Sequence, residues 1–166
     1  LLKQLLAKLA KYPTPVGADW EQEGRPRIEA PTPLIANKSI RIVAEARADR
    51  PRGVVVAQGG REHGYALHFV GGRSAFDVRV NGKVHRLSAE DAHKGKLRLE
   101  ASLDGESMTL TVNGKVVRAK SPGLIPVQPK DGLNVGYDDL SAAGDYVAPN
   151  PFRGEIVSVK VRAGDK

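Results

Sequence analysis

Short runs in which apolar and polar residues alternate fill most of the chain after residue 39. An alternation with a period of two is typical of a β-strand with one buried face. Two nearly identical segments, 80–84 and 112–116, read Val-Asn-Gly-Lys-Val, and Asn-Gly favours the two positive φ angles of a tight hairpin turn. The pattern predicts ten strands, over residues 39–47, 53–58, 64–70, 74–80, 84–88, 96–103, 107–112, 115–120, 133–137 and 153–162.

The two Asn-Gly turns also predict how the strands of each hairpin pair. In the second hairpin a two-residue turn places Leu110 opposite Val117, so both side chains face the core. In the first hairpin the same register places Asp77 opposite Arg86, with Arg79 on the same side of the strand. This predicts a polar sheet face with a cross-strand ion pair, which contributes little stability if it is exposed.

The first part of the chain has a different pattern. Leucines at positions 1, 2, 5, 6 and 9 have helical spacing, which predicts a short amphipathic helix over residues 1–12. Its leucine stripe needs a partner, on this domain, on another domain or on a membrane surface. The proline-rich residues 13–38 predict an extended connector in which Trp20 contacts the sheet. Residues 39–166 then form one all-β domain, a two-sheet antiparallel sandwich.

Composition narrows the class of protein. In 166 residues there is no cysteine, which excludes disulfides and thiolate chemistry. No apolar run reaches the roughly 20 residues that a membrane span needs. The net charge of +7 favours an anionic partner, but the basic residues are dispersed along the chain and no basic stripe interleaved with aromatics indicates nucleic-acid binding.

The sequence offers little support for catalysis. The four histidines have no close spacing typical of metal ligands, and no serine lies in a nucleophile-elbow context. Carboxylates at alternate positions of one strand, as a glycosidase of sandwich fold would need, are also missing. A glycan-active enzyme acting by itself is therefore the third alternative, behind a binding module and a structural domain.

A polar corner lies between two buried strands, around Gly59-Gly60. Polar side chains beside an aromatic ring suit sugar hydroxyls, because stacking and hydrogen bonding together compensate for lost hydration. The alternative is a plain polar corner with a tyrosine in the core. The candidate ligand-binding residues are Gln58, Arg61, His63 and Tyr65 at this corner, with Tyr137 and Tyr146 as further stacking surfaces.

Residues 131–152 form an acidic island without Lys or Arg. Within it Asp138, Asp139 and Asp145 follow a predicted strand, and hard oxygen ligands of this kind suit Ca²⁺. The alternative is that these aspartates cap turns through their own backbone. We therefore regard the three aspartates as candidate calcium ligands.

Four segments resemble a known family, the C-terminal accessory domain of bacterial arylsulfatase-like proteins. The resemblance covers about residues 39–162. Its segments are Arg-Gly-Val-Val-Val-Ala-Gln-Gly-Gly at 52–60 with His-Gly-Tyr-Ala-Leu at 63–67, Gly-Leu-Ile-Pro at 123–126, Asp-Gly-Leu-Asn-Val-Gly-Tyr-Asp at 131–138, and Phe-Arg-Gly-Glu-Ile-Val-Ser-Val-Lys-Val at 152–161.

The resemblance implies a concanavalin A-like or laminin G-like jelly roll, located in the bacterial periplasm or outside the cell. Catalysis in such proteins belongs to a separate upstream domain, so this chain would be a non-catalytic accessory module of a sulfatase-like parent. Two roles follow: binding a glycan, including a sulfated one, or a purely structural role in packing on the catalytic domain. Basic residues that would meet sulfate groups are Arg61, Arg73, Arg79 and Arg86.

Overall fold

Antiparallel β-strands make up the regular structure of the computed structural model, which describes residues 20–23, 32–139 and 141–164. These residues contain eleven strands and no helix. In chain order the strands are β1 (Trp20–Glu23), β2 (Ile40–Ala48), β3 (Gly53–Gly59), β4 (Gly64–Val70), β5 (Arg73–Val80), β6 (Lys83–Ser88), β7 (Gly95–Leu103), β8 (Ser107–Val112), β9 (Lys115–Lys120), β10 (Leu133–Val135) and β11 (Glu155–Ala163).

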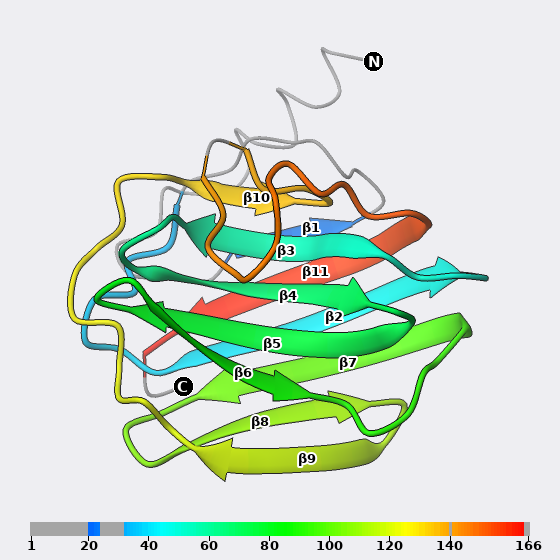
Figure 1. Ribbon diagram of the computed structural model, residues 1–166, viewed down its shortest axis with the longest axis horizontal. Helices are drawn as coiled ribbons and strands as arrows, with labels where there is room; N and C mark the ends of the chain where they lie inside the picture. The colour runs from blue at the N-terminus through cyan, green and yellow to red at the C-terminus, as the bar shows by residue number, and fades with distance from the viewer. Residues whose placement is uncertain (1–19, 24–31, 140, 165–166) are drawn as a thin grey trace.

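The strands form two sheets that stack face to face as the two layers of a sandwich (Figure 1). One sheet has the order β1-β11-β2-β7-β8-β9, and the other has the order β10-β3-β4-β5-β6. Every pairing of neighbouring strands is antiparallel. A single large core lies between the layers, and β2, β7 and β8 show the alternation of buried and more exposed positions that the sequence predicts. The predicted all-β sandwich is confirmed.

Both predicted hairpins are confirmed with their register. Asn81 and Asn113 have φ angles of 51° and 48°, and the glycine after each also has a positive φ, as a type I′ turn requires. Leu110 pairs with Val117 across β8 and β9. The short local signal was enough here because two adjacent residues decide the twist and length of the turn.

Strands β3 and β4 depart from the alternating pattern. All seven residues of β3 and six of seven in β4 are buried. The outer face of these strands is covered by residues 141–147, which we call the strap, and which lie in the orange loop crossing the sheet in Figure 1. On that face Val54, Ala57 and Ala66 form a second, small apolar cluster against which Tyr146 of the strap packs.

The N-terminal predictions have a mixed outcome. The helix expected over 1–12 lies outside the described residues. Within the stretch expected to be an extended connector, β1 joins the first sheet as an edge strand, with Trp20 in register with Val161 of β11. None of the described residues belongs to a helix long and apolar enough to span a membrane.

Candidate functional site

Two of the predicted ligand-binding residues belong to the core. The side chains of Gln58 and Tyr65 are completely buried. Gln58 donates through Nε2 to the carbonyl of Pro33 at 2.8 Å and accepts at Oε1 from the Tyr65 hydroxyl, also at 2.8 Å. Burial raises the pKa of Tyr65. This corrects the expectation that the two side chains face a ligand: they tie the segment before β2 to the sheet, and a sugar cannot reach them.

Arg61 and His63 are placed differently, at the open corner between β3 and β4. They line a cleft of about 400 Å³ together with Lys130, Asp131 and Ser141, and we call it the corner cleft. The Ser141 hydroxyl donates to Asp131 Oδ2 at 2.7 Å. The cleft thus combines exposed cations, the carboxylates of Glu62 and Asp131, and a hydroxyl, which together can serve as donors and acceptors towards hydroxyl groups.

Tyr146 and Asp138 meet beneath the strap. Asp138 is 2% exposed, and its Oδ2 accepts from the Tyr146 hydroxyl and, at 2.8 Å, from the backbone N–H of Ala143. Burial raises the pKa of Asp138, and burial together with the Asp138 carboxylate raises the pKa of Tyr146. Tyr146 therefore holds the strap in place, whereas Tyr137, the other predicted stacking residue, is half-buried.

The predicted calcium ligands are not gathered around one point. Asp139 and Asp145 are exposed, whereas Asp138 is buried and already accepts two hydrogen bonds. Among residues 32–139 and 141–164 no group of three or more acidic or histidine side chains is arranged to hold a metal ion. This arrangement does not favour calcium binding by the three aspartates, which stays a hypothesis to be tested by titration.

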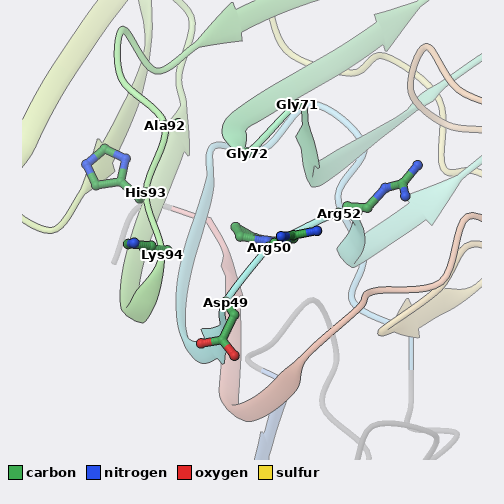
Figure 2. A pocket seen from close by; sticks show the side chains of 9 residues that line it. Asp49, Arg50, Arg52, Gly71, Gly72, Ala92, His93 and Lys94 are labelled. Atoms are coloured by element: carbon green, nitrogen blue, oxygen red, sulfur yellow. The ribbon is translucent and has the colours of Figure 1, made fainter.

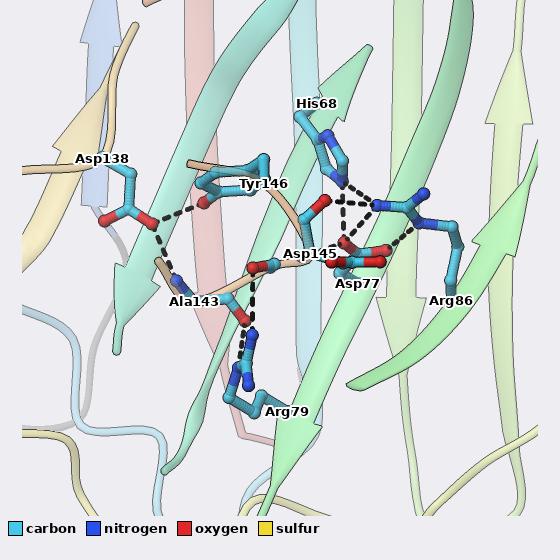
Figure 3. A network of polar contacts seen from close by, with 9 residues as sticks. His68, Asp77, Arg79, Arg86, Asp138, Ala143, Asp145 and Tyr146 are labelled. Atoms are coloured by element: carbon cyan, nitrogen blue, oxygen red, sulfur yellow. Dashed lines mark hydrogen bonds and ion pairs between the residues drawn. The ribbon is translucent and has the colours of Figure 1, made fainter. Parts of the chain in front are cut away.

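The most densely connected polar group is centred on Asp77 of β5 (Figure 3). Arg86 donates to its Oδ1 at 2.7 Å and to its Oδ2 at 2.9 Å. Oδ2 also lies 2.8 Å from His68 Nε2 and accepts from the backbone N–H of Asp145 at 2.9 Å. Burial alone would raise the pKa of Asp77, but the hydrogen bonds from Arg86 and His68 outweigh it and hold this pKa well below its usual range.

The Asp77–Arg86 pair was predicted from the register and is confirmed, but its surroundings differ from the open polar face that the sequence indicates. The side chains of His68 and Asp77 have no exposed surface, because the strap covers them. A histidine and a carboxylate at hydrogen-bond distance are a common element of catalytic sites. Here the pair cannot touch a substrate while the strap lies over it, and its role is to anchor the strap.

Arg79 fixes the strap from the other side. It donates through Nε to the carbonyl of Ala143 at 3.1 Å and through Nη2 to the carbonyl of Gly144 at 3.0 Å. Arg79 and Arg86 are thus committed to internal contacts, which corrects their expected role in meeting sulfate groups. Sequence reasoning could not detect this, because the bonded residues of the strap lie 59 to 65 positions further along the chain.

A second cleft, which the sequence did not indicate, lies at the opposite end of β3. It has a volume of about 610 Å³ and is formed by the β2–β3 loop, the β4–β5 turn and the β6–β7 loop (Figure 2). We call it the basic cleft, because its lining holds one acidic residue, Asp49, and four basic residues. These basic side chains are Arg50, Arg52, His93 and Lys94. They come from separate loops, so no contiguous motif marks them.

Comparisons with known proteins give a fold but no family. No family model and no curated protein matches the sequence. Among solved structures, the CBM40 module of the Ruminococcus gnavus IT-sialidase, bound to α2,3-sialyllactose, has a TM-score of 0.63 at 14% identity, over 86% of this chain and 90% of that chain. Domains LG4-5 of the mouse laminin α1 chain have a TM-score of 0.65 at 19% identity, over 90% of this chain and 44% of that one.

A third similar structure is the leech intramolecular trans-sialidase complexed with 2,7-anhydro-Neu5Ac, with a TM-score of 0.62 at 11% identity. The similarity covers 87% of this chain and 26% of the trans-sialidase chain. At such identities the likeness concerns the fold alone. The fold is a concanavalin A-like, laminin G-like jelly roll.

Proposed function

We propose that this chain is a non-catalytic carbohydrate-binding module and that the corner cleft holds a glycan. The observation that carries the proposal is the mixed lining of this cleft, on a fold shared with a sialyllactose-binding CBM40 module. Arg61, Lys130 and Asp131 offer both donors and acceptors, and Val127, which is 50% exposed, adds apolar surface. A sugar ring, with polar edges and apolar faces, is complementary to such a lining.

The finer assignment rests on the sequence resemblance. It makes the module part of a sulfatase-like protein of the bacterial periplasm or cell exterior, with catalysis located in another domain. On this proposal the module holds the glycan near the partner enzyme, and none of its own side chains takes part in bond cleavage. The burial of His68 and Asp77 beneath the strap supports the proposal that catalysis is located in another domain.

A purely structural role is the second candidate. Val147 of the strap is 87% exposed, and Leu34 and Val127 are 41% and 50% exposed. Packing on another protein domain would remove these apolar side chains from water. On this alternative the module packs on a catalytic domain and binds no ligand alone.

The two candidates are separated by testing the 166-residue chain on an array of neutral, sialylated and sulfated glycans. The proposal expects a saturable signal that falls about tenfold in Arg61→Ala and in Lys130→Ala, because each loses a charged hydrogen-bond donor. Arg118→Ala is the matched control, since Arg118 is exposed on β9 outside both clefts. Silence across the array, or an equal loss in the control, would overturn the proposal, and silence favours the structural role.

A further inference from the structure

The basic cleft is the larger of the two clefts and lies at the other end of the β3–β4 pair. Residues 49–52 lead into β3, whereas the corner cleft begins at Gly60, just after β3 ends. A strand of seven residues spans roughly 20 Å. The two clefts are therefore separate surfaces, and the chemistry of the basic cleft can be considered by itself.

The cations of the basic cleft have no partners in the part of the chain that the structure describes. Arg50, Arg52 and Lys94 are exposed, and their side chains make no hydrogen bond or ion pair with any described residue. Asp49 is the one acidic residue of the lining, and in Figure 2 its carboxylate points away from the Arg50 guanidinium. Some basic side chains elsewhere are neutralised, as Lys115 is by Asp91 and Arg98 is by Glu45, each at 2.9 Å. Three cations gathered in a cleft with a single carboxylate raise its positive potential and attract anions.

The backbone keeps this cleft open. Gly71 and Gly72 have φ angles of 59° and 80°, so the turn between β4 and β5 uses a left-handed conformation that favours glycine. A Cβ atom on Gly71 would meet nothing within 4 Å, and one on Gly72 would come within 3.3 Å of Ala92. The two glycines therefore line the cleft without adding side chains to it.

The 92–94 loop forms another wall of the cleft and carries His93. His93 is half-buried, and its backbone N–H donates to the carbonyl of Gly72 at 3.0 Å, which fixes the 92–94 loop against the turn. Its Nδ1 atom is buried and has no hydrogen-bond partner among the described residues. The wall that carries Lys94 is thus held in place by the backbone.

We infer that the basic cleft binds the acidic groups of a glycan, carboxylate or sulfate, through Arg50, Arg52 and Lys94. Guanidinium groups bind such oxyanions through paired, charge-assisted hydrogen bonds. This inference takes from the proposed function only that the ligand is a glycan. It adds the chemical class of that glycan and a second binding surface, which neither the fold nor the corner cleft supplies.

A nucleic acid is the competing anion, and the lining disfavours it. Among the described residues that line the cleft there is no Phe, Tyr or Trp, whereas proteins that bind single strands usually stack bases on aromatic rings. The cleft is also bounded by three loops, whereas a single-stranded nucleic acid is usually held in a groove that follows its backbone. Acidic groups on a compact sugar fit better.

The test measures binding of three oligosaccharides of equal length to the full chain by calorimetry: a sulfated heparin hexasaccharide, the carboxylated hexagalacturonate and the neutral maltohexaose. Of these, at least one acidic ligand should bind at least about tenfold more tightly than the neutral one. The variant Arg50→Gln/Arg52→Gln should lose about tenfold in affinity for it. The control Arg118→Gln/Lys120→Gln removes the same charge from β9 and should leave the affinity within about twofold.

A variant that is expected to gain affinity serves as a second test, because misfolding can lower the affinity but cannot raise it. Asp49→Asn removes the one acidic group of the cleft and should raise the affinity for the acidic ligand by about twofold to fivefold. Equal losses in the two double variants, or equal binding of acidic and neutral ligands, would overturn the inference. A single-stranded oligonucleotide that binds more tightly and depends on Arg50 and Arg52 would also overturn the assignment to a glycan. If the basic-cleft variants bind like wild type while Arg61→Ala still weakens glycan binding, this inference is wrong but the proposed function stands.

Discussion

Asp77 and Arg86 lie opposite each other on β5 and β6, and two hydrogen bonds of 2.7 Å and 2.9 Å join the carboxylate to the guanidinium. The Asp77 side chain has no exposed surface, whereas that of Arg86 is 30% exposed. The pair thus neutralises a charge that the strap has removed from water. Because the backbone N–H of Asp145 donates to the same carboxylate, the pair also links the sheet to the strap.

Replacing Asp77 should destabilise the protein strongly. Asp77→Asn keeps the size of the side chain but leaves the Arg86 charge without its partner. Breaking a buried ion pair from one side costs about 3 kcal/mol, so we expect a loss of that order in the free energy of unfolding, measured by urea denaturation. Asp91→Asn breaks the exposed pair with Lys115 and should be indistinguishable from wild type. A similar small effect for Asp77→Asn would contradict the role assigned to the pair.

Acid should remove the contribution of Asp77. Its pKa is lower in the folded protein than its ordinary value of 3.8, so the unfolded chain binds a proton first as the pH falls. The stability that Asp77 contributes is therefore fully present above about pH 5 and is lost progressively below about pH 4. The difference in unfolding free energy between wild type and Asp77→Asn should shrink below that pH. A constant difference down to about pH 2 would show that the carboxylate charge is not responsible.

Asp138 should show the opposite pH dependence. Burial raises its pKa above the ordinary value, so the folded protein holds the proton more tightly than the unfolded chain, and ionisation costs stability as the pH rises. In Asp138→Asn the amide oxygen can still accept from Tyr146 and Ala143. The difference in Tm, variant minus wild type, should therefore be larger at about pH 7 than at about pH 3.5. If this difference in Tm falls as the pH rises, the raised pKa of Asp138 is contradicted.

The strap should not tolerate a side chain at position 144. A Cβ on Gly144 would lie 2.6 Å from Tyr146 Cε2 and 2.7 Å from Asp77 Oδ2, closer than atoms can approach. Gly144→Ala should cost about 2 kcal/mol of unfolding free energy. The control is Gly105→Ala, because a Cβ there meets nothing within 4 Å, and its effect should stay within about 0.5 kcal/mol. Equal effects of the two changes would mean that the strap packs less closely.

Calcium binding is the last prediction to test. Asp138 is buried and its Oδ2 atom already accepts two hydrogen bonds, whereas Asp139 and Asp145 are exposed. We therefore expect calorimetric titration with CaCl₂ to give no saturable heat, and EDTA to leave Tm unchanged. A saturable heat in wild type that disappears in Asp139→Asn would instead establish the site expected from the acidic island.

The sequence by itself determined ten of the eleven strands of the described residues and the pairing within the two Asn-Gly hairpins. Val-Asn-Gly-Lys-Val at 80–84 and 112–116 fixed two turns and two registers, because turn geometry depends on adjacent residues and the alternation of side chains depends on a period of two. The same local information placed Asp77 opposite Arg86. It also indicated the corner that carries Arg61 and His63.

Only the tertiary structure decided which polar side chains face water. The strap, from residues 141–147, crosses the outer face of the sheet and turns Asp77, His68 and Asp138 into buried groups. The basic cleft likewise collects Arg50, Arg52 and Lys94 from loops at distant positions. Burial and charge density depend on contacts between segments far apart in the chain, and a local alternation of residues carries no information about such contacts.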